Sequence, residues 1–316
     1  MPSKRWCAKT ENLTDTNHVP SKRTAVALGL FDGLHSGHQD VIHKAVDFIP
    51  QGISPAIFTF ETDTVTTKGR GGVDVILAKD LKHELLSRLG VEYIYSPDFL
   101  NFKELTAVEF VRLVLRDKLR AKYVICGDDF RFGKGALCGR KELEVLCAEH
   151  DITVIVIPPT IIDGDIVSST RIRNHIRNGE IQLANRLLGY PFTLRLPVVH
   201  GNEIGRTMNF PTINQYFPKR QVVPRFGVYA STTIVHEKSY KSITNVGVKP
   251  TVGGETTPLA ETNIFGCTDK LYGETIQISL QQFIRPETKF DSINELKEQL
   301  EKDVAAVKEL VRLGKI

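Results

Sequence analysis

The hydrophobic positions in the first half of the chain alternate between short runs of strand length and stretches with helical spacing. Residues 24–30 form an apolar run, and the apolar residues between 41 and 49 then recur at intervals typical of a helix. The same alternation continues to residue 157, and strands that alternate with helices predict a parallel sheet with helices on both faces. We expect further strands at 56–60, 91–95, 123–126 and 153–157, and helices over 81–89, 106–115 and 141–150.

The pattern changes after Gly189, where long helical periodicities end and β-type segments begin. Glycines and prolines separate these segments, as expected for a small antiparallel barrel with functional loops. Ser292 and Glu295 then form a capping-box pattern that opens a closing helix, whose apolar stripe predicts packing against the barrel. We expect strands at 192–199, 227–235, 241–246 and 275–284, and we place the stripe at Leu296, Leu300, Val304, Val307 and Leu310.

The length supports two domains. The chain has 316 residues, and one domain commonly takes about 100 to 200 residues. We therefore expect an α/β domain over residues 24–188 and a β domain over residues 191–316, preceded by a polar and flexible tail over residues 1–23.

Composition and cysteine content agree with a soluble, cytoplasmic protein. Hydrophobic residues make up 41% and charged residues 25%, which argues against a disordered or fibrous chain. No run reaches the roughly 18 apolar residues of a membrane helix, and the N-terminus lacks the apolar segment of a secretory signal. The five cysteines are scattered without a CxxC pair, so we expect reduced thiols rather than a zinc or redox site.

The net charge of +4 is modest for a protein that binds nucleic acid. Most of it lies in the N-terminal tail, and the remaining chain is nearly neutral. Nucleic-acid binding is therefore favoured only by this tail, and we expect no nucleic-acid or membrane partner. The oligomeric state does not follow from the sequence.

A first candidate site follows the first predicted strand, in the segment GLFDGLHSGH. His35 and His38 lie three residues apart at a helix start, where imidazoles, backbone N–H groups and the helix dipole can meet a phosphate. A polar turn with incidental histidines and a zinc site are the alternatives. The candidate nucleotide-binding residues around the histidines are Gly29, Phe31, Asp32 and Gly33.

Two further polar stretches follow later strands. GDDFRFG, residues 127–133, contains Asp129, and SSTRIR, residues 168–173, offers hydroxyl groups and two arginines at the start of a helix. Ser169, Thr170 and Arg173 could together hold a triphosphate. A plain N-cap and solvent-exposed arginines are the alternatives.

The second half carries its own candidate groups. Gly201, Gly205 and Arg206 lie in a glycine loop, and Thr212 and Asn214 point to one face if their segment is a strand. A hydroxyl and an amide oxygen on one face could share a Mg²⁺ ion. Glu261 begins another expected strand and is either a general base or an exposed acid.

These motifs, in this order, resemble bacterial bifunctional riboflavin kinase/FAD synthetases. GLFDGLHSGHQ, GDDFRFG and SSTRIRNHIRNGEIQLANRLLG are similar to the FMN adenylyltransferase module, a Rossmann-like nucleotidyltransferase. The resemblance implies that His35 and His38 stabilise the ATP phosphates during attack by the FMN phosphate. It also implies that Asp129 lies in the nucleotide site, and that Ser169, Thr170 and Arg173 form a second phosphate-binding motif.

The second half resembles the riboflavin kinase module through HGNEIGRTMNFPTIN, NVGVKPT, ETNIF and RPETKF. The resemblance implies that Thr212 and Asn214 bind Mg²⁺ and ATP, with Gly201, Gly205 and Arg206 shaping the phosphate loop. It implies that Glu261 takes the proton of the ribityl 5′-hydroxyl and that Arg285 lies near the flavin. The expected substrates and products are riboflavin, FMN, FAD and ATP.

Three departures from the family pattern keep alternatives open. Residues 60–64 read FETDT where the family has Phe-x-Pro-His-Pro, Met208-Asn209 replaces Leu-Gly, and Asn263 replaces a histidine. The first departure could slow adenylyl transfer or alter its substrate. We expect the kinase site to remain functional despite the other two. Two alternatives follow. The first is an enzyme with only one active module, namely a riboflavin kinase whose adenylyltransferase is impaired. The second is a flavin-binding regulator without turnover.

Overall fold

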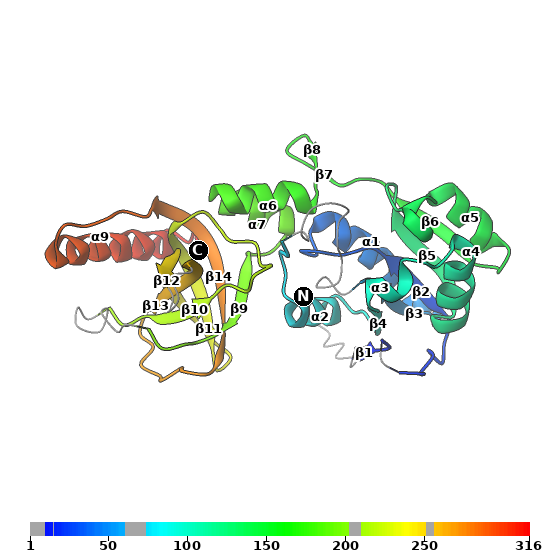
Figure 1. Cartoon of the computed structure of the whole chain (residues 1–316), viewed down its shortest axis with the longest axis horizontal. Helices are drawn as coiled ribbons and strands as arrows, with labels where there is room; N and C mark the ends of the chain where they lie inside the picture. The colour runs from blue at the N-terminus through cyan, green and yellow to red at the C-terminus, as the bar shows by residue number, and fades with distance from the viewer. Residues whose placement is uncertain (1–9, 15, 61–73, 202–209, 251–255) are drawn as a thin grey trace. The chain divides into compact units, whose positions relative to one another are not determined.

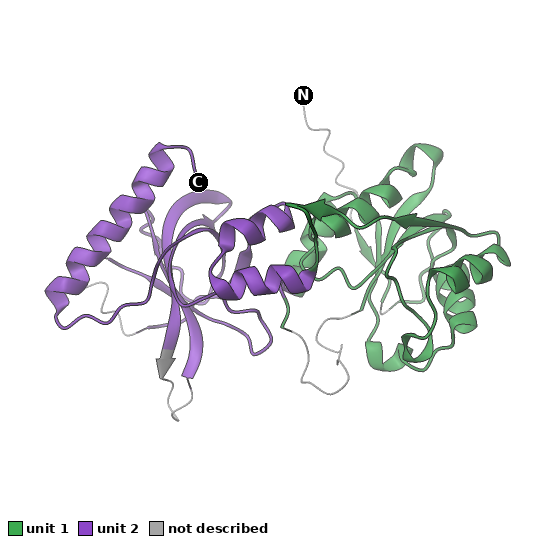
Figure 2. Ribbon diagram, turned by 90° about the horizontal axis from the view of Figure 1, so that it is seen from above, with its two compact units in different colours: residues 1–75, 79–168 green, residues 76–78, 169–316 purple. Residues whose placement is uncertain are grey.

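The structure is a computed structural model that describes residues 10–14, 16–60, 74–201, 210–250 and 256–316. It divides the chain into two compact units, coloured in Figure 2. Unit 1 comprises residues 1–75 and 79–168, and unit 2 comprises residues 76–78 and 169–316. No helix within the described ranges is long and apolar enough to cross a membrane.

Unit 1 is built on a six-stranded sheet in which every neighbouring pair of strands is parallel. The spatial order is β1-β4-β3-β2-β5-β6, so the winding of the chain reverses between β2 and β5. Open parallel sheets bind ligands at the carboxyl ends of the strands at such a switch point. The strands are β1 (Glu11–Asn12), β2 (Thr24–Leu28), β3 (Ser54–Phe58), β4 (Tyr93–Tyr95), β5 (Ala121–Gly127) and β6 (Thr153–Ile157).

Helices connect these strands as the alternating pattern predicted. Thr106 caps α4 and forms the expected capping box with Glu109, and the helix continues as a π-helical segment, Phe110–Lys118. The helices of unit 1 are α1 (Ser36–Val46), α2 (Lys79–Arg88), α3 (Phe99–Phe102), α4 (Ala107–Glu109) and α5 (Arg140–Ala148), with 3-10 turns at Ile49–Gln51 and Lys134–Ala136. A small hairpin, β7 (Ile161–Ile162) and β8 (Asp165–Ile166), precedes α6.

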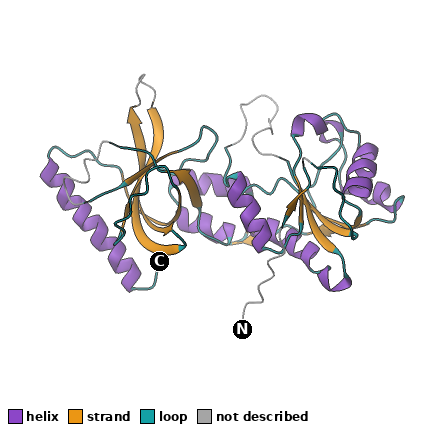
Figure 3. Cartoon of the chain, turned by 90° about the horizontal axis from the view of Figure 1, so that it is seen from below, coloured by secondary structure: helices purple, strands orange, loops and turns teal. Residues whose placement is uncertain are grey.

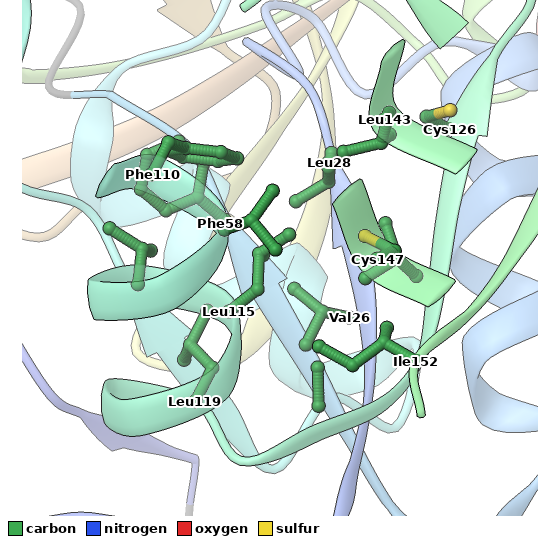
Figure 4. Packing of buried hydrophobic residues seen from close by; sticks show 14 of the residues in the cluster. Val26, Leu28, Phe58, Phe110, Leu115, Leu119, Cys126, Leu143, Cys147 and Ile152 are labelled. Carbon is green, nitrogen blue, oxygen red and sulfur yellow. The ribbon is translucent and has the colours of Figure 1, made fainter. Parts of the chain in front are cut away.

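The core of unit 1 explains why its central strands are apolar at every position. All residues of β2 and β3 are buried, because helices cover both faces of the sheet. On one face, Val26 and Leu28 of the sheet belong to a cluster with Phe110 and Leu115 of the π-helical segment (Figure 4). The predicted α/β class is confirmed.

Part of the expected flexible tail is structured. β1 pairs with β4 at the edge of the sheet, and Leu13 is completely buried. The side chains of Lys118 and Arg120 donate hydrogen bonds to four backbone carbonyls between residues 16 and 21. The buried side chain of Leu13 and these hydrogen bonds hold residues of the segment that we expected, from its composition, to be a flexible tail. Residues 1–9 lie outside the described part of the chain.

Unit 2 contains a six-stranded antiparallel sheet that is nearly closed into a barrel (Figure 3). Its order is β10-β13-β12-β11-β14-β9, and a bridge between Val199 and Asn214 brings the two edges together. The Gln215 amide inside the barrel donates to the carbonyls of Leu196 and Ile276. The strands are β9 (Thr193–Pro197), β10 (Ile213–Tyr216), β11 (Gly227–Val235), β12 (Lys238–Pro250), β13 (Thr256–Ile264) and β14 (Thr275–Pro286).

The division between the units differs from the boundary that we expected near Gly189. Two helices before this glycine, α6 (Ser169–Asn178) and α7 (Ile181–Leu188), belong to unit 2. Asn185 of α7 donates to the carbonyl of Leu280 and accepts from the amide of Phe192, which attaches the helix to the barrel. The end of helical periodicity at Gly189 therefore marks the change from helices to strands, whereas the units divide between residues 168 and 169.

The closing helix α9 (Ile293–Arg312) packs against the outside of the barrel (Figure 1). Ser292 caps it by accepting from the amide of Glu295, as the sequence pattern predicted. Val307 is completely buried in a cluster with Val228, Ala230 and Ile243. The predicted packing face is thus confirmed for Val304, Val307 and Leu310.

Candidate active sites

The loop after β2 turns sharply into α1. The backbone φ angles of Phe31, Gly33 and Leu34 are all positive, at 50°, 78° and 39°. Positive φ is strained for Phe31 and Leu34, and their side chains are buried, with about 1% of each exposed. Buried anchors thus hold a loop that brings Asp32 and the two histidines to the carboxyl end of the central strand.

The two imidazoles predicted to meet a phosphate form a stacked pair. The ring centroids of His35 and His38 lie 3.6 Å apart with an interplanar angle of 18°. His35 is the N-cap of α1, and its Nδ1 accepts a hydrogen bond of 3.3 Å from the amide of His38. Nδ1 is therefore the acceptor, and a neutral His35 carries its proton on Nε2.

His38 is the more enclosed member of the pair. Burial, followed by the neighbouring His35 and Lys82, lowers its pKa well below the ordinary value of 6.5. The Phe31 ring meets it edge-on at 5.3 Å. Its buried Nδ1 has no hydrogen-bond partner within the described residues. A neutral imidazole with an unsatisfied nitrogen at a helix N-terminus suits a ligand that supplies a polar atom there.

Lys82 is a buried cation at this site that the sequence reasoning missed. Its Nζ donates to the carbonyl of Leu30 at 2.8 Å and to Oγ1 of Thr59 at 2.9 Å. The signal was present in the helical spacing, because Lys82 stands three, four and seven residues before Leu85, Leu86 and Leu89. A lysine among these leucines occupies a position on the apolar side of α2.

Asp129 lies close to the same edge of the sheet. β5 pairs with β2 through Ala27 and Ile125 and ends at Gly127, two residues before Asp129. Asp129 is exposed, whereas the neighbouring Asp128 forms an ion pair of 2.5 Å with Arg140. The structure thus brings the histidine loop and Asp129 to the carboxyl ends of adjacent strands.

Residues 169–173 of the third predicted stretch lie in unit 2. Ser169 and Thr170 form the first turn of α6, and Arg173 follows on the same helix. Ile172 and Ile176 are completely buried and anchor the helix. The hydroxyl groups therefore stand at a helix N-terminus, as the sequence predicted.

The barrel aligns the candidate kinase residues in one row across its strands. Asn214 of β10 pairs with Glu261 of β13, which pairs with Asn245 of β12. The row continues through Val228 of β11 to Arg285 of β14. Glu261 thus lies within β13, rather than at its start as we expected.

Strand alternation places this row on the outer face of the barrel. Inside the barrel, the hydroxyl groups of Thr244 and Thr262 lie 2.9 Å apart, and both residues are completely buried. Their chain neighbours, Asn245 and Glu261, therefore point outward. Asn245 is a second polar residue that we had not singled out, although it lies in the NVGVKPT motif.

Asn214 is held tightly beside Gly201. Only 6% of Asn214 is exposed, and a Cβ atom on Gly201 would lie 2.5 Å from its Nδ2. No side chain larger than that of glycine fits at residue 201 unless Asn214 moves. Thr212 is half-buried two residues before Asn214. Gly205 and Arg206 lie outside the described residues, as do Glu61–Thr64 of the first departure and Met208-Asn209 of the second.

Arg285 makes an ion pair with α9. Its guanidinium bonds both carboxylate oxygens of Asp303, with a shortest distance of 2.7 Å, and Nη1 donates to the carbonyl of Pro286. Gln299 also donates to Asp303, of which only 2% is exposed. Arg285 therefore joins the barrel to α9, a role that the resemblance did not imply.

The comparisons with known proteins cover nearly the whole chain. A model of the FAD synthetase family matches residues 18–171, and a model of the riboflavin kinase family matches residues 188–311. The bifunctional riboflavin kinase/FMN adenylyltransferase of Listeria monocytogenes is 34% identical over 93% of this chain and 92% of its own length. The Bacillus subtilis protein of the same name is 33% identical over 93% and 96%.

The chain belongs to the family of bifunctional riboflavin kinase/FMN adenylyltransferases. A solved structure from Streptococcus pneumoniae, named a macrolide-efflux protein, shares its fold with a TM-score of 0.83. The two are 31% identical, and the match covers 95% of this chain and 98% of that one. The resemblance inferred from the motifs is confirmed.

Within this family, the third departure has a structural explanation. The amide of Asn263 donates a hydrogen bond of 2.7 Å to the carbonyl of Pro211. This bond ties β13 to the segment immediately before Thr212. Asparagine can make it, as a neutral histidine could, because only an N–H donor is needed.

Proposed function

We propose that the chain is a bifunctional enzyme of flavin cofactor synthesis. It phosphorylates riboflavin to FMN with ATP, and it transfers the adenylyl group of a second ATP to FMN, which gives FAD and pyrophosphate. The observation that carries this proposal is the joint match of both family models in one chain, with relatives of the same name aligned over nearly its full length.

For adenylyl transfer we propose that His35 and His38 hold the phosphates of ATP. An oxygen of the FMN phosphate attacks the α-phosphorus, and pyrophosphate leaves in line. The reaction needs no nucleophile from the protein, so catalysis consists of positioning and of stabilising charge. The stacked rings and the N-terminus of α1 support this role. Gly29, Phe31, Asp32, Gly33 and Asp129 are proposed to shape the nucleotide site.

We further propose Ser169, Thr170 and Arg173 as a phosphate-binding group. Two hydroxyl groups and an arginine at the N-terminal end of α6 are suitable donors for an anion. The match to the FAD synthetase family extends to residue 171 and so includes both hydroxyl groups.

For the kinase reaction we propose Glu261 as general base. It takes the proton of the ribityl 5′-hydroxyl while that oxygen attacks the γ-phosphorus of ATP, and ADP leaves. Its place beside Asn214 in the strand pairing supports the proposal, because one residue would then activate the nucleophile next to another that holds the phosphates. Gly201, Gly205 and Arg206 are proposed to form the phosphate loop.

Asn214 of this row and Thr212, which immediately precedes β10, fit a Mg²⁺ ion bound together with ATP. Thr212 and Asn214 supply a hydroxyl and an amide oxygen, the hard ligands that Mg²⁺ prefers. Mg²⁺ sites commonly use one or two protein ligands and complete their coordination with phosphates and water. The ion would neutralise charge on the transferring phosphoryl group. We place the enzyme in the cytoplasm, where both reactions would draw on cellular ATP.

Incubation of the purified chain with riboflavin, ATP and Mg²⁺ tests the proposal. We expect riboflavin to decline, FMN to rise and FAD to follow, each resolved by chromatography, with ADP and pyrophosphate as the other products. FMN without FAD, also when FMN is supplied, would indicate an inactive adenylyltransferase. Tight flavin binding without ATP consumption would indicate a regulator and contradict the proposal.

A further inference from the structure

Lys82 connects the two central strands where the nucleotide loop begins. Its ammonium donates to the carbonyl of Leu30, which follows β2, and to the hydroxyl of Thr59, which follows β3. The hydroxyl of Thr59 itself donates to Leu30 at 2.9 Å. These three groups hydrogen-bond to one another, so the position of Lys82 helps to fix the carbonyl immediately before Phe31 and the histidine loop.

Burial of a lysine at this position is energetically unfavourable. Only 5% of Lys82 is exposed, and lysines are rarely buried because removal of the ammonium from water costs free energy. The leucines on the same side of α2 show that an apolar residue suits this helix face. A methionine of similar length could fill the space without that cost. The retained charge therefore indicates a role that packing does not explain.

The charge of Lys82 acts on His38, one member of the histidine pair. Lys82 contributes, after burial and His35, to the lowered pKa of His38. His35, at the N-cap of α1, and Lys82, from α2, are the ionisable groups that act on this imidazole, and Asp32 lies buried in the same loop. The ammonium of Lys82 thus contributes positive charge at this end of the sheet, while the lowered pKa keeps His38 neutral.

We propose that Lys82 is a positioning residue of the adenylyltransferase site, which holds the start of the histidine loop and places a buried positive charge beside His35 and His38. This inference rests on the proposed function. An ammonium in a site shielded from water favours the negative charge of a triphosphate more strongly than an exposed one does. The neutral imidazole of His38 beside it can still form a hydrogen bond with a phosphate oxygen.

The test compares K82M with K82R and with K79M, which removes the same charge from an exposed position of the same helix. For FAD formation from FMN, we expect K82M to lose about 100-fold in kcat/KM, with part of the loss in KM for ATP. K82R should retain more activity than K82M, and K79M should match the parent chain. FMN formation from riboflavin, in unit 2 of the same chain, reports whether each variant is folded.

A second measurement separates charge from packing. The pKa of His38, followed by NMR of the imidazole protons, should rise in K82M and stay low in K82R, because only K82M removes the positive neighbour. Unchanged FAD formation in K82M would overturn the proposal, and so would an unchanged His38 pKa. Loss of both reactions in K82M and K82R would also overturn it, since a general structural role would then suffice. If the parent chain itself forms no FAD, the proposed function fails instead.

Discussion

At the residue scale, the stacked histidines predict which reaction a substitution of His38 should affect. His38→Ala removes the buried ring that faces His35 and Phe31, so we expect FAD formation from FMN to fall by about 100-fold or more. FMN formation from riboflavin should remain at the parent level, since Glu261 and its row lie in unit 2. Both rates can be measured on one preparation by chromatography of the flavins.

His43→Ala is the matched control, because His43 lies on the same helix and is exposed. We expect it to change neither rate. Equal loss of FAD formation in both variants would point to damage of α1 rather than to a role for the imidazole of His38.

The cysteines give a second prediction at this scale. Burial raises the pKa of Cys126 to about 11 and that of Cys147 to about 12, and both side chains lie in the core of unit 1 (Figure 4). Because the thiolate is the reactive form, iodoacetamide at pH 8 should modify Cys138 and Cys267 well before these two. Mass spectrometry of digests at successive times measures the order. Early modification of Cys147 in the folded protein would contradict the burial.

At the element scale, α9 depends on an ion pair with the barrel. Asp303→Ala leaves Arg285 without its carboxylate partner in a mostly buried position, where loss of one partner costs about 3–5 kcal/mol. We expect the kinase activity of unit 2 to be lost at a lower urea concentration than in the parent chain. Glu301→Ala, which removes an exposed carboxylate from the same helix, should leave the midpoint nearly unchanged.

The double variant Arg285→Met/Asp303→Leu tests whether the pair acts as a unit. Replacing both ions by apolar groups avoids a buried unpaired charge, so this variant should be more stable than Asp303→Ala. An equal or greater loss of stability would show that Asp303 acts mainly through Gln299 or through the packing of α9.

Elements with strong local signals were predictable from the sequence. The strand at 227–235 and the caps at Thr106 and Ser292 follow from alternation and capping patterns alone. β1 was missed because two residues in a polar segment carry no period, and their hydrogen bonds come from β4. β10, with four residues, overlaps the segment of Thr212 and Asn214, whose strand conformation the sequence analysis considered only as a condition.

The candidate sites show the same limit. The motifs identified His35, His38, Asn214 and Glu261, but the pairing of Asn214 with Glu261 depends on the register of two strands far apart in the sequence. Register is set by packing and by loop geometry, which no local pattern reports. Lys82 was missed because its contacts are backbone and hydroxyl oxygens from two other elements.

At the scale of the whole molecule, we propose that the histidine pair of unit 1 and the Glu261 row of unit 2 serve different reactions. Glu261→Gln removes a carboxylate from unit 2 and keeps its shape, so we expect FMN formation to fall by about 100-fold or more. FAD formation from supplied FMN should continue. Glu237→Gln, an exposed residue of the hairpin between β11 and β12, is the matched control and should change neither rate. Loss of both reactions in Glu261→Gln would contradict their separation.

These single-site variants allow a test of how the units cooperate. A mixture of His38→Ala and Glu261→Gln chains holds one functional kinase and one functional adenylyltransferase on separate molecules. If FMN leaves the kinase and enters the other site from solution, the mixture forms FAD from riboflavin after a lag, although neither variant alone does so efficiently. Because FMN must first accumulate, the lag should shorten as the His38→Ala chain is increased and should disappear when FMN is added. Formation of FMN by the mixture without FAD, despite an active Glu261→Gln chain, would show that the product of one unit is not released for the other.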